Sequence, residues 1–311
     1  MSHNHSHTCN HSHSHSHTHV PKDFGRTFLI AASLNMLFIV AEVIYGLKAN
    51  SLALLADAGH NFSDVIGLLL AWGAWWLSKR KPSARYTYGL RSTSILAALA
   101  NAILLLVAVG GIAWEAVERF TAHQPIAGGT VMAVAGLGIV INGATAWMFS
   151  HGQGDLNVRG AYLHLAADAL VSVGVVLAGF IISRTGWLWL DPVTSLVIVA
   201  VIIVGTWGLL RDSVNLALHA VPAGVDIEKL RDYLTAQDCI GGVHDLHVWG
   251  MSTTEIAMSV HLVTPKGHPG DKFLEELTEG LQHQFGIHHT TIQIELGNGT
   301  MECRQQPDEV V

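Results

Sequence analysis

The chain has 311 residues, of which half are hydrophobic and only 13% are charged, and its mean hydropathy is positive. Soluble domains carry roughly a quarter charged residues, so this composition indicates an integral membrane protein. The net charge of −7, with no basic stripe, argues against a nucleic-acid binder, and three widely spaced cysteines fit a reducing compartment rather than a disulfide framework.

Histidine dominates the N-terminal segment. Residues 1–19 contain eight His interleaved mainly with Ser, Thr and Asn, and nothing in them can build a core. We therefore predict a disordered cytoplasmic tail over residues 1–23 that binds metal loosely through neutral imidazoles. Such a tail would either raise the local metal concentration or be dispensable. An engineered tag is the alternative origin of the segment.

Six apolar stretches follow the tail. Each is close to the ~20 residues that a helix needs to cross ~30 Å of hydrocarbon. The first stretch begins late and lacks a clear cleavage site, which argues against a cleavable signal peptide. The expected membrane domain, residues 24–210, contains helices at 24–47, 52–77, 93–117, 127–150, 161–184 and 188–210.

Basic residues near the helix ends predict the orientation. With a cytoplasmic N-terminus, nine Lys and Arg residues lie inside and three lie outside, as the positive-inside rule favours. The inside set is Lys22, Arg26, Lys79, Arg80, Lys81, Arg85, Arg91, Arg159 and Arg211, and the outside set is Lys48, Arg119 and Arg184. Six spans return the chain to its starting side, so both termini are expected in the cytoplasm. The compact chain, without targeting signals, favours a bacterial inner membrane.

The remaining residues change character. Residues 211–297 contain two stretches with helical spacing, "GVDIEKLRDYLTAQ" and "PGDKFLEELTEGLQHQF", and three β-rich runs. In chain order they predict an α-β-β-α-β domain, a small sheet with helices on one face. Residues 298–311 form a polar tail that is expected to fray.

Titratable residues inside the expected membrane helices give the strongest functional signal. His60 and Asp64 are four residues apart in the second helix, and His164 and Asp168 repeat this spacing in the fifth, so each pair shares a helix face. A central Asp costs ~2.5–3.5 kcal/mol in a membrane helix. Together the pairs supply two imidazole nitrogens and two carboxylate oxygens, a tetrahedral set suited to Zn2+. These ligands offset one another's cost only around a cation or when protonated, so we expect metal to exchange for protons.

Structural roles are the alternative for these polar residues. Hydrogen bonds between helices could explain one such pair, but two copies of one motif favour metal binding. Asp57, three residues before His60, is expected either behind the metal ligands or in helix packing. Four further polar residues are expected to bond between helices or to line a wet cavity rather than to bind metal: Asn35, Glu42, Asn101 and Asn142.

These motifs resemble the cation diffusion facilitator family, in particular its zinc-exporting branch. The resemblance covers nearly the whole chain and rests on "SLALLADAGHNFSD", "YTYGLRS", "HLAADALVS", "DPVTSLVI" and "VHDLHVWGM". It implies six transmembrane helices, a cytoplasmic α-β-β-α-β domain, a homodimer, and Zn2+/H+ antiport by alternating access. The transport site would comprise His60, Asp64, His164 and Asp168. In the family, His at the first of these positions goes with a preference for zinc over cadmium.

The resemblance also implies metal in the cytoplasmic domain. Three His and one Glu of this chain resemble the family's cytoplasmic zinc site. Together they would supply all four ligands of a tetrahedral site with a structural or regulatory role. The residues of this set are His244, His261, His288 and Glu295. The alternative is that histidines at strand ends simply face solvent.

Two further sites known from relatives are less well supported. In some relatives an N-terminal segment of His and Cys reaches a pair of C-terminal cysteines, and the residues here are His7, Cys9, His11 and Cys303. Other relatives bind zinc in the loop between spans two and three, but residues 78–93 contain no His, Asp, Glu or Cys. We expect no metal in that loop, whose basic residues would meet anionic lipid headgroups or form salt bridges to the cytoplasmic domain.

Other classes of protein fit less well. A membrane-anchored zinc sensor or store would suit the His-rich tail and the cytoplasmic ligands, but not the repeated pairs in the membrane. The sequence has no H-E-x-x-H motif and no G-x-x-x-x-G-K-[ST] loop, so we expect neither an intramembrane metalloenzyme nor an ATP-driven pump.

Overall fold

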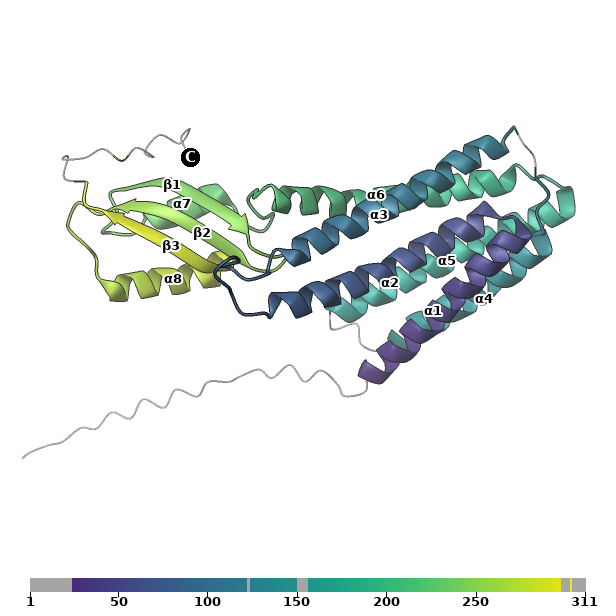
Figure 1. The fold of residues 1–311 in the computed structure, drawn as a ribbon, viewed down its shortest axis with the longest axis horizontal. Coiled ribbons are helices and arrows are strands. Elements are labelled where there is room, and N and C mark those ends of the chain that lie inside the picture. The colour runs from purple at the N-terminus through teal and green to yellow at the C-terminus, as the bar shows by residue number, and fades with distance from the viewer. Residues whose placement is uncertain (1–23, 122–123, 150–155, 298–302, 304–311) are drawn as a thin grey trace, which may run out of the picture.

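The computed structural model of the chain describes residues 24–121, 124–149, 156–297 and 303, which form a long helical bundle with a small α/β domain at one end (Figure 1). The bundle helices are α1 (Phe24–Ala49), α2 (Leu52–Ser78), α3 (Thr93–Arg119), α4 (Gly128–Phe149), α5 (Leu156–Thr185) and α6 (Leu190–Ala217). They follow the six apolar stretches in order. α6 continues past residue 210 to Ala217, so its last turns lead directly into the small domain.

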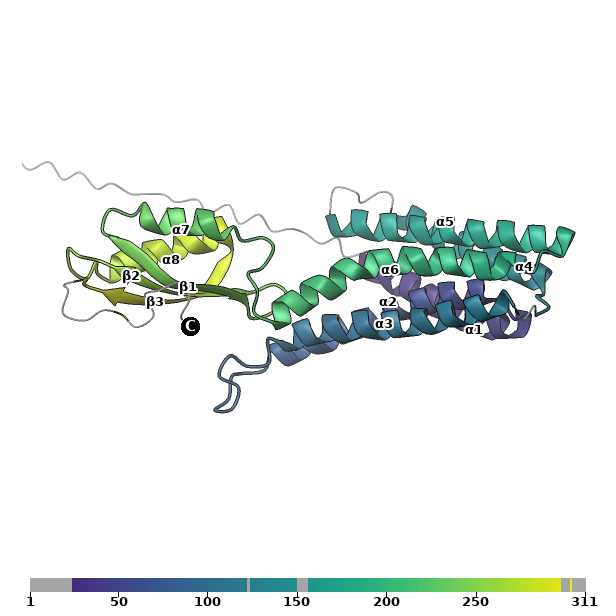
Figure 2. The same ribbon diagram turned by 90° about the horizontal axis from the view of Figure 1, so that it is seen from above.

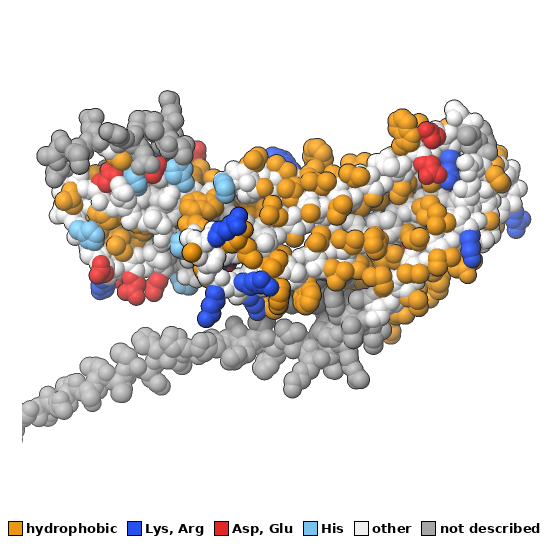
Figure 3. Space-filling view, viewed as in Figure 1, with side chains coloured by type: hydrophobic (Ala, Val, Ile, Leu, Met, Phe, Trp, Pro, Cys, Tyr) orange, Lys and Arg blue, Asp and Glu red, His pale blue; other side chains and the backbone are white. Residues whose placement is uncertain are grey.

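Four of the described helices are long and apolar enough to cross a membrane. They are Thr93–Arg119, Gly128–Met148, Tyr162–Thr185 and Leu190–Ala217. Large hydrophobic side chains face outward along the bundle, among them Leu104, Val107 and Val204. Figure 3 shows hydrophobic side chains over the visible face of the bundle and charged side chains gathered towards its two ends. Lipid, not water, favours such a surface, so the bundle is a membrane domain.

Helix packing divides the bundle into two groups. α5 packs mainly along α4, whereas α2 and α6 both pack along α3. α1 contacts both groups, through α2 and through α4. α2 and α5 meet with few contacts, and we call the line between these two helices the seam. Side chains placed on the seam therefore come from two different groups of helices.

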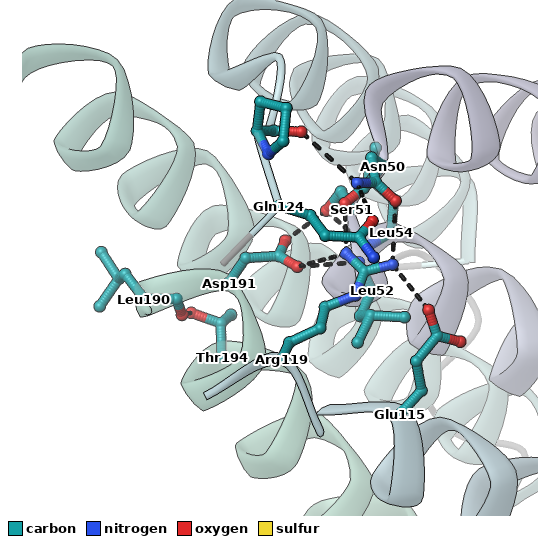
Figure 4. Close-up of polar contacts among 11 residues, drawn as sticks. Asn50, Ser51, Leu52, Leu54, Glu115, Arg119, Gln124, Leu190, Asp191 and Thr194 are labelled. Atoms are coloured by element: carbon teal, nitrogen blue, oxygen red, sulfur yellow. Dashed lines mark hydrogen bonds and ion pairs between the residues drawn. The ribbon is translucent and has the colours of Figure 1, made fainter. Parts of the chain in front are cut away.

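A buried polar network fixes the end of the bundle away from the small domain (Figure 4). Asp191, at the start of α6, accepts hydrogen bonds from the Ser51 hydroxyl (2.5 Å) and the Leu52 backbone N–H (2.9 Å). A carboxylate there stabilises the N-terminus of α2. Arg119, at the end of α3, donates to the backbone and side-chain oxygens of Asn50 and lies 4.0 Å from Asp191. The network ties α3 and α6 to the turn between α1 and α2.

The small domain has the predicted α-β-β-α-β order. Its elements are α7 (Ile227–Thr235), β1 (Gly242–Gly250), β2 (Ile256–Val263), α8 (Asp271–Phe285) and β3 (Ile287–Glu295). The sheet order is β1-β2-β3, with β1 antiparallel and β3 parallel to β2. Both helices lie on one face of the sheet (Figure 2), where Leu230, Leu234, Leu277 and Leu281 bury their side chains against Met258.

Polar contacts join the small domain to the bundle. Arg91, in the loop between α2 and α3, forms an ion pair with Glu255 at 2.5 Å. The Ser92 hydroxyl donates to the Met251 carbonyl at 3.2 Å. The basic residues of this loop were expected either to meet lipid headgroups or to form salt bridges to the small domain. Arg91 forms such a salt bridge.

Candidate metal centres

The four ligands predicted in the membrane meet at the seam. α2 and α5 run antiparallel, so residues one turn apart on one helix face residues one turn apart on the other. Asp64 Oδ2 lies 3.1 Å from His164 Nε2, and His60 Nε2 lies 3.7 Å from Asp168 Oδ1. We call His60, Asp64, His164 and Asp168 the seam cluster.

The distances within the seam cluster fit a tetrahedral ion. Zinc bonds of about 2.0–2.2 Å place neighbouring ligand atoms about 3.3–3.6 Å apart. The Nε2 atom of His164 lies 3.1 and 3.6 Å from oxygens of Asp64 and Asp168, and that of His60 lies 3.8 and 3.7 Å from the same two carboxylates. One ligand atom from each of His60, His164 and Asp168 can be chosen so that all lie within 4.8 Å of one another. Asp64 is not part of this compact group of three, but its Oδ2 lies 3.1 Å from His164 Nε2 and 3.8 Å from His60 Nε2.

Exposure falls in steps along the seam. At the end nearer the small domain, the side chains of His164 and Asp64 are 46% and 35% exposed. One turn further, those of His60 and Asp168 are 25% and 5% exposed. At the next turn, Asp57 and Ser172 are buried. The cluster is therefore open on the side facing the small domain and closed on the other.

Asp57 lies in this closed part of the seam rather than in the compact ligand set. Its Oδ2 is 3.5 Å from the Ser172 hydroxyl of α5. Among the other polar residues, Asn61 donates from its amide to Glu42 at 3.4 Å. Asn101 lines a cavity of about 860 Å3 between α2, α3 and the small domain. The side chains of Asn35 and Asn142 hold buried oxygen atoms without a hydrogen-bond partner.

A second ligand group lies at the edge of the small domain. His244 on β1 pairs with His261 on β2, and their rings are 5.2 Å apart. Glu295, at the end of β3, places its two oxygens 3.3 Å from His244 Nε2 and 3.2 Å from His261 Nδ1. Cys303 Sγ lies 3.6 Å from the same Nδ1 atom. We call His244, His261, Glu295 and Cys303 the sheet cluster.

The sheet cluster offers two imidazoles, a carboxylate and a thiol, which are all common zinc ligands. Burial alone would raise the pKa of Glu295, but hydrogen bonds from Gln293 and Cys303 and two neighbouring imidazoles hold it below its ordinary value. An ionised carboxylate is the form that binds metal. The residues present therefore fit a zinc ion.

Asp245 supports the sheet cluster, and the sequence analysis missed it. A β-bulge interrupts the pairing of β1 with β2 between His244 and His247, and Asp245 takes a positive φ of 51° there. Its carboxylate lies 3.3 Å from His261 Nε2 and 2.9 Å from His247 Nε2. A carboxylate on the far nitrogen of a metal-ligating His fixes its tautomer and orientation. The only signal in the sequence was an Asp beside His in "VHDLH".

His288 is not brought to the sheet cluster. It is exposed at the start of β3, whereas Glu295 ends the same strand. At ~3.3 Å per residue the strand separates them by roughly 20 Å or more. The expected set of three His and one Glu is therefore corrected to two His and one Glu, with Cys303 beside them. His7, Cys9 and His11 lie outside the described residues.

A membrane bundle with a His and Asp cluster on a seam, joined to a small domain with a cluster of His, Glu and Cys, points to a membrane protein that handles metal cations. Residues 28–216 match the family model of the cation efflux transmembrane domain, and residues 222–296 match that of the cytoplasmic domain of cation efflux proteins. The chain belongs to this cation efflux family, the cation diffusion facilitators. The small domain is accordingly its cytoplasmic domain.

Bacterial relatives support this assignment along most of the chain. Zinc transporter ZitB of Shigella flexneri is 39% identical over 273 residues, which cover 87% of either chain. Metal cation efflux system protein CzcD of Cupriavidus metallidurans is 37% identical over 273 residues, 87% of this chain and 86% of the relative. A Bacillus subtilis relative, named as a cadmium, cobalt and zinc/H(+)-K(+) antiporter, is 33% identical over 264 residues, 83% of this chain and 85% of its own. These relatives are named as transport or efflux proteins, not as enzymes.

Proposed function

We propose that the chain spans the membrane six times and exports Zn2+ from the cytoplasm in exchange for H+ by alternating access. The seam cluster is the transport site. The observation that carries this proposal is the meeting of two His-x-x-x-Asp pairs, from α2 and α5, at distances that suit a tetrahedral ion. The names of the relatives support zinc as the substrate.

Placement on the seam suits a site that must bind and then release its ion. His60 and Asp64 are on α2, which packs along α3, whereas His164 and Asp168 are on α5, which packs along α4. Opening the seam on either side would therefore expose the ion to that side. The exposure of Asp64 and His164 towards the cytoplasmic domain corresponds to a state that accepts zinc from the cytoplasm.

Proton exchange gives the export step a driving force. A divalent ion that leaves a cell with a negative interior works against ~4.6 kcal/mol per 100 mV, at ~2.3 kcal/mol per charge. Protons that enter in exchange offset this cost. They also occupy the carboxylates and imidazoles after the metal leaves, which keeps unpaired charge out of the membrane.

The remaining assignments follow the same scheme. Both termini lie in the cytoplasm of a bacterium, the bundle crosses the inner membrane, and two chains assemble as a homodimer through the membrane and cytoplasmic domains. The sheet cluster holds a regulatory or structural zinc ion, with His244, His261 and Glu295 as ligands and Cys303 as the fourth. Bound zinc there would cross-link β1, β2 and β3 to the C-terminal segment.

Flux through reconstituted protein tests the proposal. Liposomes would contain the purified chain, a zinc dye and a pH dye, and an imposed proton gradient would drive exchange. We compare the native protein with Asp168→Asn, and use Asp232→Asn, an exposed change on α7, as the matched control. The native protein and the control should move zinc with opposite proton flux. In Asp168→Asn, the rate of zinc transport should fall by more than ~10–100-fold, which is the usual cost of removing a residue that only supports a metal ligand.

Each contrary outcome has a distinct meaning. If Asp168→Asn moves zinc at the native rate, the seam cluster is structural and the proposed site is wrong. If the native protein moves zinc without proton flux, exchange is wrong while the site stands. If the native protein binds zinc but moves none, a membrane-anchored sensor or store replaces the transporter.

A further inference from the structure

The cavity of about 860 Å3 between α2, α3 and the cytoplasmic domain is elongated along the two helices. Small residues line the part inside the bundle, namely Gly67 and Ala71 on α2 and Ala98 on α3. The lining of α2 ends at Ser78, about 16 Å from Gly67 at ~1.5 Å per residue. We call this cavity the α2–α3 groove. It extends over roughly half of the ~30 Å hydrocarbon thickness of a membrane.

The α2–α3 groove opens to the outside of the bundle. Trp75 on α2 and Leu209 on α6 line it and are 53% and 42% exposed, and Ala71 is also exposed. In a membrane domain such side chains face hydrocarbon rather than water. An acyl chain that enters the groove therefore contacts mainly small and apolar residues.

Three consecutive cations, Lys79, Arg80 and Lys81, line the cytoplasmic end of the groove. Lys79 Nζ lies 3.6 Å from the centre of the Trp75 ring, and Arg80 Cζ lies 4.5 Å from the centre of the Trp76 ring. Trp, Lys and Arg gathered at a helix end mark the level of the lipid headgroups. Figure 3 shows Lys and Arg side chains where the bundle meets the cytoplasmic domain.

The charge of these three cations is not balanced within the part of the chain that the structure describes. Glu255 is the acidic residue of the described lining, and Arg91 already pairs with it at 2.5 Å. Basic pockets beside membrane helices on the cytoplasmic side bind acidic headgroups. A phosphate group would supply the missing negative charge at the level where lipid phosphates lie.

We propose that the α2–α3 groove binds one anionic phospholipid from the cytoplasmic leaflet. Its phosphate lies among Lys79, Arg80 and Lys81, and one acyl chain follows the groove past Ala71 towards Gly67. A second copy of the protein fits this place less well, because a two-fold contact there would bring the same three cations of both copies together. The proposal needs α2 to cross the membrane, as in the proposed function, but it does not need zinc to exchange for protons.

Photolabelling in nanodiscs tests the inference. The full-length protein is reconstituted in phosphatidylcholine with a small fraction of a lipid that carries a diazirine on one acyl chain. This probe is either a phosphatidylglycerol or a phosphatidylcholine with the same acyl chains. After irradiation, mass spectrometry gives the labelled fraction at the α2 and α3 residues that line the groove.

The first pair of variants tests the headgroup. In Lys79→Gln/Arg80→Gln/Lys81→Gln the cations of the groove are removed. The matched control loses the same charge from exposed positions of the cytoplasmic domain, in Lys229→Gln/Lys266→Gln/Lys272→Gln. The native protein and the control should take at least ~10-fold more label from phosphatidylglycerol than from phosphatidylcholine, since each basic residue near the surface contributes roughly fivefold. The first variant should lose this preference.

The second pair of variants tests the acyl chain. Ala71→Phe keeps all the cations and fills the groove. Ala100→Phe, at an exposed α3 position that is not among the described lining residues, is the matched control. Ala71→Phe should lose most of the label in the groove, whereas Ala100→Phe should be labelled like the native protein. If Ala71→Phe does not fold, as judged by size-exclusion chromatography, the charge variant decides.

Several outcomes would overturn the inference. Equal labelling by the two probes, or an unchanged preference in the charge variant, would mean that the groove does not recognise the headgroup. Native labelling in Ala71→Phe would place the acyl chain elsewhere. If inorganic phosphate displaces the label more than sodium chloride of equal ionic strength, the cations bind a free anion. If the groove takes no label and Ala98→Cys forms a disulfide between two copies, a second copy covers it.

The proposed function can fail independently of this result. A native protein that moves no zinc in the flux assay contradicts the transporter, whatever the labelling of the groove. A native protein that exchanges zinc for protons but shows no preference for the anionic probe contradicts only the lipid site.

Discussion

The two ligand groups of this chain are built on different supports. The seam cluster draws its four residues from two helices that have few contacts with each other, and all of its side chains except that of Asp168 are partly exposed. The sheet cluster draws His244 and His261 from directly paired strands, and both are buried. One group joins two helices that have few contacts with each other, and the other includes two histidines on strands whose backbone hydrogen bonds must break before these residues separate.

The residues that support the histidines from behind also differ between the two clusters. In the sheet cluster, Asp245 holds His261 from behind, which leaves its Nδ1 atom facing Glu295 and Cys303. In the seam cluster, the buried Nδ1 atom of His60 has no hydrogen-bond partner. A histidine fixed from behind keeps its other nitrogen aimed at the metal position, which favours retention of an ion. The comparison predicts that the two groups respond separately to mutation.

The largest effect should follow removal of a ligand at the seam. In His164→Ala, we expect zinc transport to fall to background, because the imidazole that lies nearer to both carboxylates is gone. Zinc bound at the sheet cluster should stay, as measured by the protection of β1 and β2 amides in hydrogen exchange. If zinc no longer protects the sheet in this variant, the two groups are not independent.

A smaller effect on transport should follow the matching change in the sheet. His261→Ala removes the residue that lies between Glu295, Cys303 and Asp245. We expect zinc to lose its protective effect on β1, β2 and β3, because binding stabilises only a state that holds the ligands together. Transport should continue at a reduced rate. Transport at background would mean that the sheet cluster is part of the export step itself.

The role of Asp245 can be separated from that of the ligands. Asp245→Asn keeps the size of the side chain but removes the charge that faces His261 and His247. We expect zinc affinity of the sheet cluster to fall by ~10–100-fold, the usual cost of losing such a partner. Exchange protection measured over a zinc titration gives this shift. An unchanged midpoint would show that Asp245 serves only the bulge in β1.

Sequence alone predicted the features that regular periodicity determines. The apolar stretches gave the order of the helices because span length is set by the membrane, and the repeated His-x-x-x-Asp spacing placed two ligands on one face of α2 and two on one face of α5. Spacing within a helix also shows which residues share a turn. The repeated spacing therefore predicted His60, Asp64, His164 and Asp168 as one site without knowledge of how the helices pack.

Features that depend on irregular backbone or on distant segments were not predictable in this way. Alternation along β1 would turn Asp245 away from His244, and only the bulge brings its carboxylate to His261. Cys303 reaches the sheet from beyond the last strand, where no periodicity applies. Glu42 is in a different helix from Asn61, so no spacing links the two. His288 was misplaced because nearness to a strand end does not say which end meets the ligands.

The smallest effect concerns the charge of Glu295 in the absence of metal. Its pKa lies below the ordinary value, so the folded sheet prefers the ionised form. The resulting stability is present above the unfolded pKa of about 4.3 and is lost as pH falls through the lower, folded value. With zinc chelated, β3 in the native protein should therefore open less readily than in Glu295→Gln at neutral pH, by ~1 kcal/mol. The difference should shrink on acidification, as followed by hydrogen exchange, while Glu275→Gln on the exposed face of α8 should match the native protein throughout. A difference that is constant with pH would assign the effect to packing rather than to charge.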